Sequence, residues 1–123
     1  MVLKLSNVMI GSDNPQRLVE FYTRVLGEPS MKEGGFTGWM LGGCFFSIGE
    51  HSEVHGQNSA PGRIIFFLDT EDVKGEFERV KGLGAMVIKE PYEMGEQFSL
   101  ATLADPDGNY FQLATPYEVP AKA

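Results

Sequence analysis

The chain contains the same order of elements twice. Residues 3–11 alternate as a strand, the residues after Asn14 carry apolar side chains at helical spacing, and short strands follow near Met31 and at 36–41 and 44–49. After a polar stretch the order returns, with a strand at 63–69, a helix at 70–82 and strands at 85–90, 98–104 and 109–115. Self-similarity at a fixed offset is the mark of a duplicated unit. The sequence therefore predicts an α+β fold of two pseudo-symmetric β-α-β-β-β units.

The two predicted helices share one apolar pattern. An offset of 55 residues superposes three apolar pairs, which are Leu18 and Val73, Tyr22 and Phe77, and Val25 and Val80. We expect Asn14 to cap the first helix, with Pro15 at its first position, and Thr70 to cap the second. An amphipathic helix must bury its apolar stripe against another element. The prediction is thus one curled eight-stranded sheet with both helices on its outer face.

The length of the chain suits a single domain. With 123 residues, of which 42% are hydrophobic, it can bury one ordinary core but not two independent ones. We predict one domain over residues 1–120, made of repeat units 1–50 and 62–118. The polar, Gly- and Pro-containing stretch 51–61 is expected to be a surface connector between them.

Charge and cysteine content exclude several classes of function. A net charge of −7 argues against nucleic acid and against anionic membrane surfaces, because both require clustered Lys and Arg. No apolar run approaches the roughly 20 residues that span a bilayer. Cys44 is the only cysteine, so an intramolecular disulfide is impossible and a reducing cytoplasm fits best.

Strand alternation predicts which side chains face away from the helices. On the last strands of the two units these are Phe45 and Ser47 and, correspondingly, Tyr110 and Gln112. On the first strands they include Asn7 and its expected counterpart Arg63. A pseudo-twofold axis would bring the polar members of this set to the floor of one cleft. The predicted ligand-binding residues are Asn7, Trp39, Phe45, Ser47, Arg63, Phe67, Phe98, Tyr110 and Gln112.

Aromatic side chains are abundant around this predicted cleft. Trp39, Phe67 and Phe98 add to an apolar wall that is larger than a solvent-facing surface should carry. A bound ligand, a second subunit or a plain packed core could each cover it. Arg63 would need an anionic partner in such a wall, on a ligand or on the protein.

Two motifs resemble those of a known family. FYTRVLG at residues 21–27 and DPDGNYFQL at residues 105–113, together with the paired units, resemble the vicinal oxygen chelate superfamily, which includes glyoxalase I, extradiol dioxygenases and bleomycin-resistance proteins. The resemblance covers about residues 3–115 and implies a small-molecule cleft and a homodimer.

The resemblance breaks down at the metal ligands. Metal enzymes of the superfamily use His, Gln or a carboxylate at four strand positions, where this chain has Asn7, Ser47, Arg63 and Gln112. Neutral amide and hydroxyl groups are weak ligands, and a permanent cation repels a metal ion. We therefore expect no divalent metal and no cofactor.

Three functions remain open. The first is a metal-free protein that binds a small, partly aromatic molecule, as in drug sequestration. The second is an enzyme, either a metal-dependent lyase, epimerase or dioxygenase with other ligands, or one that uses Glu50, His51 or Tyr110. The third is a structural dimer without a ligand. The pair His51 and His55 is expected to be solvated, because the connector has no helical pattern. The acidic charge suits a cationic ligand and Arg63 an anionic one, so the ligand stays unidentified.

Overall fold

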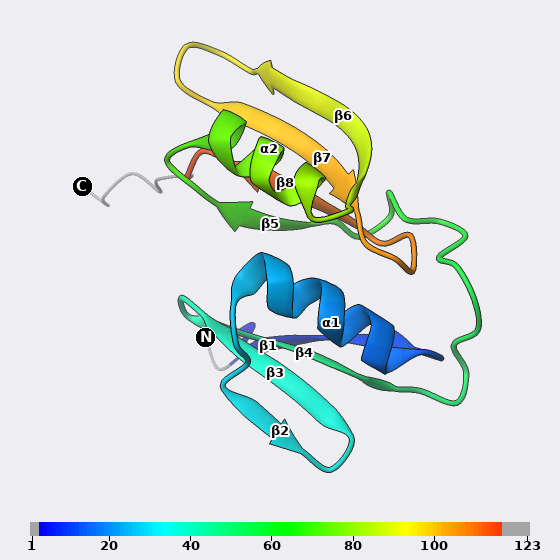
Figure 1. The fold of residues 1–123 in the computed structure, drawn as a ribbon. Coiled ribbons are helices and arrows are strands. Elements are labelled where there is room, and N and C mark those ends of the chain that lie inside the picture. Colours follow the sequence, from blue (N-terminus) through cyan, green and yellow to red (C-terminus); the bar gives the residue numbers. More distant parts are fainter. Residues whose placement is uncertain (1–2, 117–123) are drawn as a thin grey trace. The chain divides into compact units, whose positions relative to one another are not determined.

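The computed structural model describes residues 3–116 and divides the chain into two compact units (Figure 1). The units are Met1–Gln57 and Asn58–Ala123, so the division lies inside the predicted connector 51–61. Residues 1–2 and 117–120 of the predicted domain lie outside the described residues. Among the described residues, no helix is long and apolar enough to cross a membrane.

The first unit is one helix on a four-stranded sheet. Its elements are β1 (Asn7–Ser12), α1 (Pro15–Leu26), β2 (Met31–Glu33), β3 (Phe36–Leu41) and β4 (Cys44–Glu50). The strand order is β1-β4-β3-β2, with β1 parallel to β4 and the other neighbours antiparallel. The first and last strands of the unit therefore lie side by side.

The second unit has the same topology. Its elements are β5 (Phe66–Asp69), α2 (Val73–Gly82), β6 (Met86–Glu93), β7 (Ser99–Ala104) and β8 (Tyr110–Ala114). The order β5-β8-β7-β6, with β5 parallel to β8, repeats that of the first unit. The predicted α+β fold of two β-α-β-β-β units is confirmed, and its eight strands are hydrogen-bonded as two four-stranded sheets.

Helix α1 begins and ends as its sequence predicts. The Asn14 side chain accepts a hydrogen bond from the backbone N–H of Arg17, and Pro15 occupies the first helical position. The helix stops at Gly27, whose φ of 94° favours glycine. Its buried residues lie on one stripe and are Leu18, Phe21, Tyr22 and Val25.

Helix α2 begins later than predicted. Asp72 caps it by accepting from the Gly75 N–H, so the prediction of Thr70 as the cap is wrong. The Thr70 N–H donates to the Ala114 carbonyl of β8, and its hydroxyl accepts from the Asp72 N–H, so Thr70 belongs to the turn between β5 and the helix. The buried residues Val73, Phe77 and Val80 nevertheless match the α1 stripe at the predicted offset.

The first strand of each unit is shorter than its alternating sequence suggests. β1 begins at Asn7 rather than Leu3, and β5 begins at Phe66 rather than Arg63. The β1–β4 ladder starts at the pair Asn7–Phe45, and the Ser6 carbonyl just before it still accepts from the Phe45 N–H. Alternation alone does not make a strand, because each backbone group also needs a neighbour to pair with.

The core of the first unit is aromatic. The rings of Tyr22 and Phe46 lie 5.1 Å apart in an edge-to-face contact, and Trp39 packs 5.9 Å from Phe46. The Trp39 indole N–H donates to the Gly27 carbonyl at 2.8 Å. Sheet and helix end are therefore joined by one buried side chain, since Trp39 is only 2% exposed.

An ion pair lies on the outer surface of α2. Arg79 donates to both carboxylate oxygens of Glu76, and this hydrogen bonding lowers the pKa of the Glu76 carboxyl. A carboxyl whose pKa is lower in the folded protein than in the unfolded chain stabilises the fold at pH values above its ordinary pKa. This stabilisation is lost as the pH falls through the lowered pKa. Both side chains are partly exposed, so the contribution to stability is small.

We predict that Trp39→Phe lowers the free energy of unfolding by about 1–3 kcal/mol, because it leaves the Gly27 carbonyl without its donor and reduces buried volume. Urea denaturation measures the change. Met40→Leu is the control, because Met40 is exposed on the other side of β3 and should stay within about 0.5 kcal/mol. Equal stability of both variants and the parent would contradict the role given to Trp39.

Candidate ligand-binding site

The first sheet has one face that α1 does not cover. Cross-strand partners share a face, and the β1–β4 register pairs Asn7 with Phe45 and Met9 with Ser47. On β3 the partner of Ser47 is Gly38. We call this surface the first helix-distal face, and its members, by register, are Asn7, Met9, Gly11, Met31, Glu33, Phe36, Gly38, Met40, Phe45, Ser47 and Gly49. Three of the predicted ligand-binding residues, Asn7, Phe45 and Ser47, thus lie together.

Two aromatic rings on this face lie over glycines of the neighbouring strand. A Cβ atom built on Gly38 would collide with the Phe45 ring, and one built on Gly49 would come within 2.7 Å of the Phe36 ring. Both glycines therefore admit a ring close to the backbone. Phe36 stays 40% exposed and presents aromatic surface outward.

The second sheet has the equivalent surface. The β5–β8 register pairs Phe67 with Gln112, and β7–β8 pairs Thr102 with Gln112 and Ala104 with Tyr110. Phe67 is 50% exposed, whereas Phe111 and Leu113 on the opposite face are buried. The second helix-distal face consists, by register, of Phe67, Asp69, Met86, Lys89, Tyr92, Leu100, Thr102, Ala104, Tyr110, Gln112 and Ala114. The predicted residues Phe67, Tyr110 and Gln112 are brought together on it.

The polar residue that sequence reasoning missed is Thr102. Its hydroxyl donates to the Gln112 Oε1 atom at 2.7 Å. The tight turn between β7 and β8 contained the signal, because pairing Ala104 with Tyr110 across DPDG places Thr102 opposite Gln112. Asp105 fixes this turn by accepting from the backbone N–H groups of Asp107 and Asn109.

The prediction of Trp39 as a ligand-binding residue is wrong. Trp39 pairs with Phe46 in the β3–β4 ladder, and both rings face α1. Alternation along β3 sends Met40 rather than Trp39 to the helix-distal face. Trp39 is a core residue.

Arg63 is not the counterpart of Asn7. Asn7 lies two residues before Met9, the partner of Ser47, whereas Arg63 lies four residues before Phe67, the partner of Gln112. Arg63 precedes β5 in a turn whose N–H donates to the Ala60 carbonyl, and it is exposed. A solvated guanidinium needs no anionic partner, so the argument for an anion clamp in an apolar wall does not apply.

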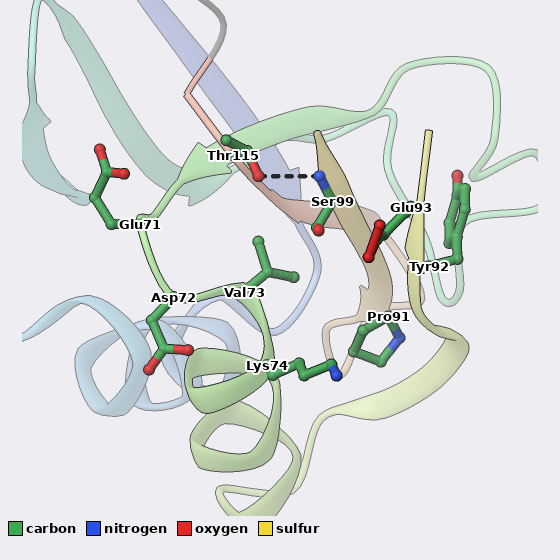
Figure 2. Close-up of a pocket in the computed structure, with 9 residues that line it drawn as sticks. All are labelled: Glu71, Asp72, Val73, Lys74, Pro91, Tyr92, Glu93, Ser99 and Thr115. Carbon is green, nitrogen blue, oxygen red and sulfur yellow. Dashed lines mark hydrogen bonds between the residues drawn. The ribbon is translucent and has the colours of Figure 1, made fainter. Parts of the chain in front are cut away.

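Phe98 lines a different surface from the other predicted ligand-binding residues. It precedes β7 and lines a pocket with Glu71, Met94 and Glu96. A neighbouring pocket of about 320 Å³ lies at the start of α2 (Figure 2). Its lining is mostly polar, and the Ser99 N–H there donates to Thr115 Oγ1, as the dashed line shows. Neither pocket contains Gln112, Tyr110 or Phe67.

The connector histidines lie in a turn. His51 Nδ1 accepts from the Glu53 N–H, and its side chain lies against Gly11, while His55 is exposed. The Gly56 N–H donates to the Asp13 carboxylate at 2.7 Å, which fastens this segment to the end of β1. Among residues 3–116, no three His, Cys, Asp or Glu side chains gather as a metal site.

Paired β-α-β-β-β units with a DPDG turn before the last strand define a class of protein, the vicinal oxygen chelate superfamily. The sequence profile of the family described as "Glyoxalase-like domain" matches residues 7–114. The chain belongs to this glyoxalase-like family. No curated protein matches it in sequence.

Solved structures share the fold. A glyoxalase/bleomycin resistance protein/dioxygenase family enzyme from Burkholderia phytofirmans is 25% identical, with a TM-score of 0.73 over 92% of this chain and 98% of that one. A glyoxalase-related enzyme from Fulvimarina pelagi has a TM-score of 0.76 at 15% identity, over 94% of this chain and 89% of that one. A glyoxalase/bleomycin resistance protein from Albidiferax ferrireducens has a TM-score of 0.70 at 21% identity, over 91% of this chain and 98% of that one.

The side chains at the family's metal positions do not fit a divalent ion. Ser47 and Gln112 offer a hydroxyl and an amide where a carboxylate would be needed, and Asn7 offers a second amide. The Gln112 oxygen already accepts the Thr102 proton. The register places Ile65, an apolar residue, where a fourth ligand would align with Asn7.

We predict that Gly49→Ala destabilises the first unit by about 1–3 kcal/mol, because the new methyl group would displace the Phe36 ring. Gly43→Ala is the matched control, since a Cβ there meets nothing within 4 Å, and it should be neutral or slightly stabilising. Urea unfolding measures both changes. The ring placement is refuted if the two variants are equally stable.

Proposed function

We propose that this protein binds a small, partly aromatic molecule without a metal, in the manner of the bleomycin-resistance members of its superfamily. Drug sequestration is the form of this function that fits a binding protein without turnover. Each helix-distal face, taken by itself, offers contacts for such a molecule.

The observation that carries the proposal is the neutral polar set on these faces. Asn7 and Ser47 lie on the first face and Gln112 on the second, whereas the carboxylates of these faces, Glu33 and Asp69, are the register partners of Phe36 and Ala114 and lie outside this set. Neutral amides and hydroxyls orient a ligand by hydrogen bonds, whereas metal-dependent chemistry needs stronger donors. The proposal therefore includes no cofactor.

Exposed aromatic surface next to these groups supports the same function. Phe36 and Phe67 present rings on the two faces, and the tip of the Phe45 ring lies close to the Gly38 backbone. A binding site for a small molecule combines mostly apolar walls with a few placed polar groups. Planar aromatic ligands suit such surfaces because they stack on rings.

An enzymatic role is the alternative, and one residue supports it. Tyr110 is a half-buried phenol on the second helix-distal face, two residues from Gln112. A phenol in a site can donate or accept a proton. Product formation from a bound ligand, lost in Tyr110→Phe, would favour this alternative.

A thermal-shift screen of planar aromatic compounds, with and without a chelator, tests the proposal. We expect hits that raise the melting temperature by several degrees and are unaffected by the chelator. Phe67→Ser should weaken a hit by about tenfold or more, whereas Met94→Ser, at an exposed loop residue, should not. Calorimetric titration with Zn²⁺, Ni²⁺ and Mn²⁺ completes the test. Tight, stoichiometric metal binding would overturn the metal-free proposal.

We also propose a homodimer, with the protein in the reducing cytoplasm that a free Cys44 thiol suits. β1 and β5 are edge strands, and Leu5 and Ile64 just before them are 80% and 82% exposed. Exposed apolar residues beside an open strand edge favour pairing with another chain.

Light scattering after gel filtration should give twice the chain mass for the parent. The variants Leu5→Glu and Ile64→Glu should be monomers, whereas the control variant Met94→Glu should remain a dimer. A monomeric parent would refute the proposed homodimer.

A further inference from the structure

We propose that Thr102 is a positioning residue that fixes the polarity of the Gln112 amide, so that the site selects ligands carrying an acceptor oxygen beside an aromatic ring. This inference rests on the proposed function and adds the class of ligand. A ketone, an amide carbonyl or a carboxylate on an aromatic framework meets the requirement.

The hydrogen bond between the two residues has a defined direction. The Thr102 Oγ1 atom and the Gln112 Oε1 atom are 2.7 Å apart. That distance is typical of an O–H donor and an oxygen acceptor, and it lies at the short limit for an amide nitrogen and an oxygen. The hydroxyl therefore donates and the amide oxygen accepts.

The surroundings disfavour the reversed amide. With Nε2 toward Thr102, the hydroxyl would have to accept, and its proton would need another acceptor. Thr102 is only 7% exposed, its neighbours of the same face on β7, Leu100 and Ala104, are apolar, and its register partner on β6, Lys89, carries donors only. No second acceptor for the Thr102 hydroxyl is present among residues 3–116. The reversed amide would thus leave a hydroxyl proton without an acceptor in a nearly dry position.

The outward atom of Gln112 is consequently its nitrogen. The amide nitrogen carries two N–H donors and no acceptor. Within the described part of the chain no group accepts from them, and the residue is half-buried rather than sealed in. The Gln112 amide therefore presents donors alone to a ligand.

The donors lie beside an exposed ring. Phe67 is the register partner of Gln112 on the neighbouring strand and is half exposed on the same face. Neighbouring strands are about 4.8 Å apart, which is close enough for one small ligand to contact both side chains. The geometry therefore selects an aromatic ring with an acceptor oxygen close to it.

Three probes of similar size test this selection. Acetophenone and benzoate carry acceptor oxygens, whereas benzylamine is a cationic donor at neutral pH. Titrations followed by NMR of ¹⁵N-labelled protein report the affinities and the Gln112 side-chain signal, which is identified by its loss in Gln112→Glu. The net charge of −7 favours benzylamine, so a preference for benzoate would have to arise locally.

In the parent protein we expect both acceptor probes to bind about tenfold more tightly than benzylamine, the size expected of one hydrogen bond, and to shift the Gln112 signal. Thr102→Val, which keeps the shape but removes the hydroxyl, should reduce this ratio to less than about threefold. Thr102→Ser should keep it. Gln112→Glu should reverse the preference, because a carboxylate has acceptors only.

The outcomes separate this inference from the proposed function. If the probes shift signals of the helix-distal faces but Thr102→Val leaves the affinity ratio unchanged, or if the parent prefers benzylamine, the inference is wrong and the proposed function stands. If none of the three probes binds, both are overturned. Backbone NMR spectra of Thr102→Val and Thr102→Ser show whether each variant is folded.

Discussion

Each unit depends on the parallel pairing of its first and last strands. β1 pairs with β4 and β5 pairs with β8 in the same direction, and parallel neighbours require a crossover connection, which the helix supplies. That crossover places the helix on one face of its sheet (Figure 1). One pairing thus separates a buried helix-facing core from a surface that the helix leaves available for function.

The chemistry of that surface comes from contacts between strands rather than within them. Phe45 lies over Gly38 and Phe36 over Gly49, so flat rings are combined with close backbone. Thr102 and Gln112 meet in the same way across the β7–β8 hairpin. Membership of the glyoxalase-like family supplies the fold, while these cross-strand pairs set the chemistry of the surface, since function resides in the site rather than in the fold.

Much of this arrangement could be predicted from periodicity. The apolar stripes of both helices, their offset of 55 residues and the faces of Asn7, Ser47 and Gln112 follow from spacings of 3.6 and 2 residues. The capping residue of α2 could not be predicted in this way. Thr70 and Asp72 are both good caps, and the hydrogen bond of the Thr70 N–H to Ala114 on β8, a contact over a long sequence distance, decided between them.

The sequence by itself determined the repeated unit, its class and the absence of strong metal donors at the expected strand positions, because these depend on residue type and local period. Tertiary structure alone decided that Trp39 belongs to the core, that Arg63 precedes its strand and that Thr102 holds Gln112. Those three outcomes depend on strand register and on where a partner strand begins. Register is set by pairing over long sequence distances, and a shift of one residue exchanges the two faces of a strand.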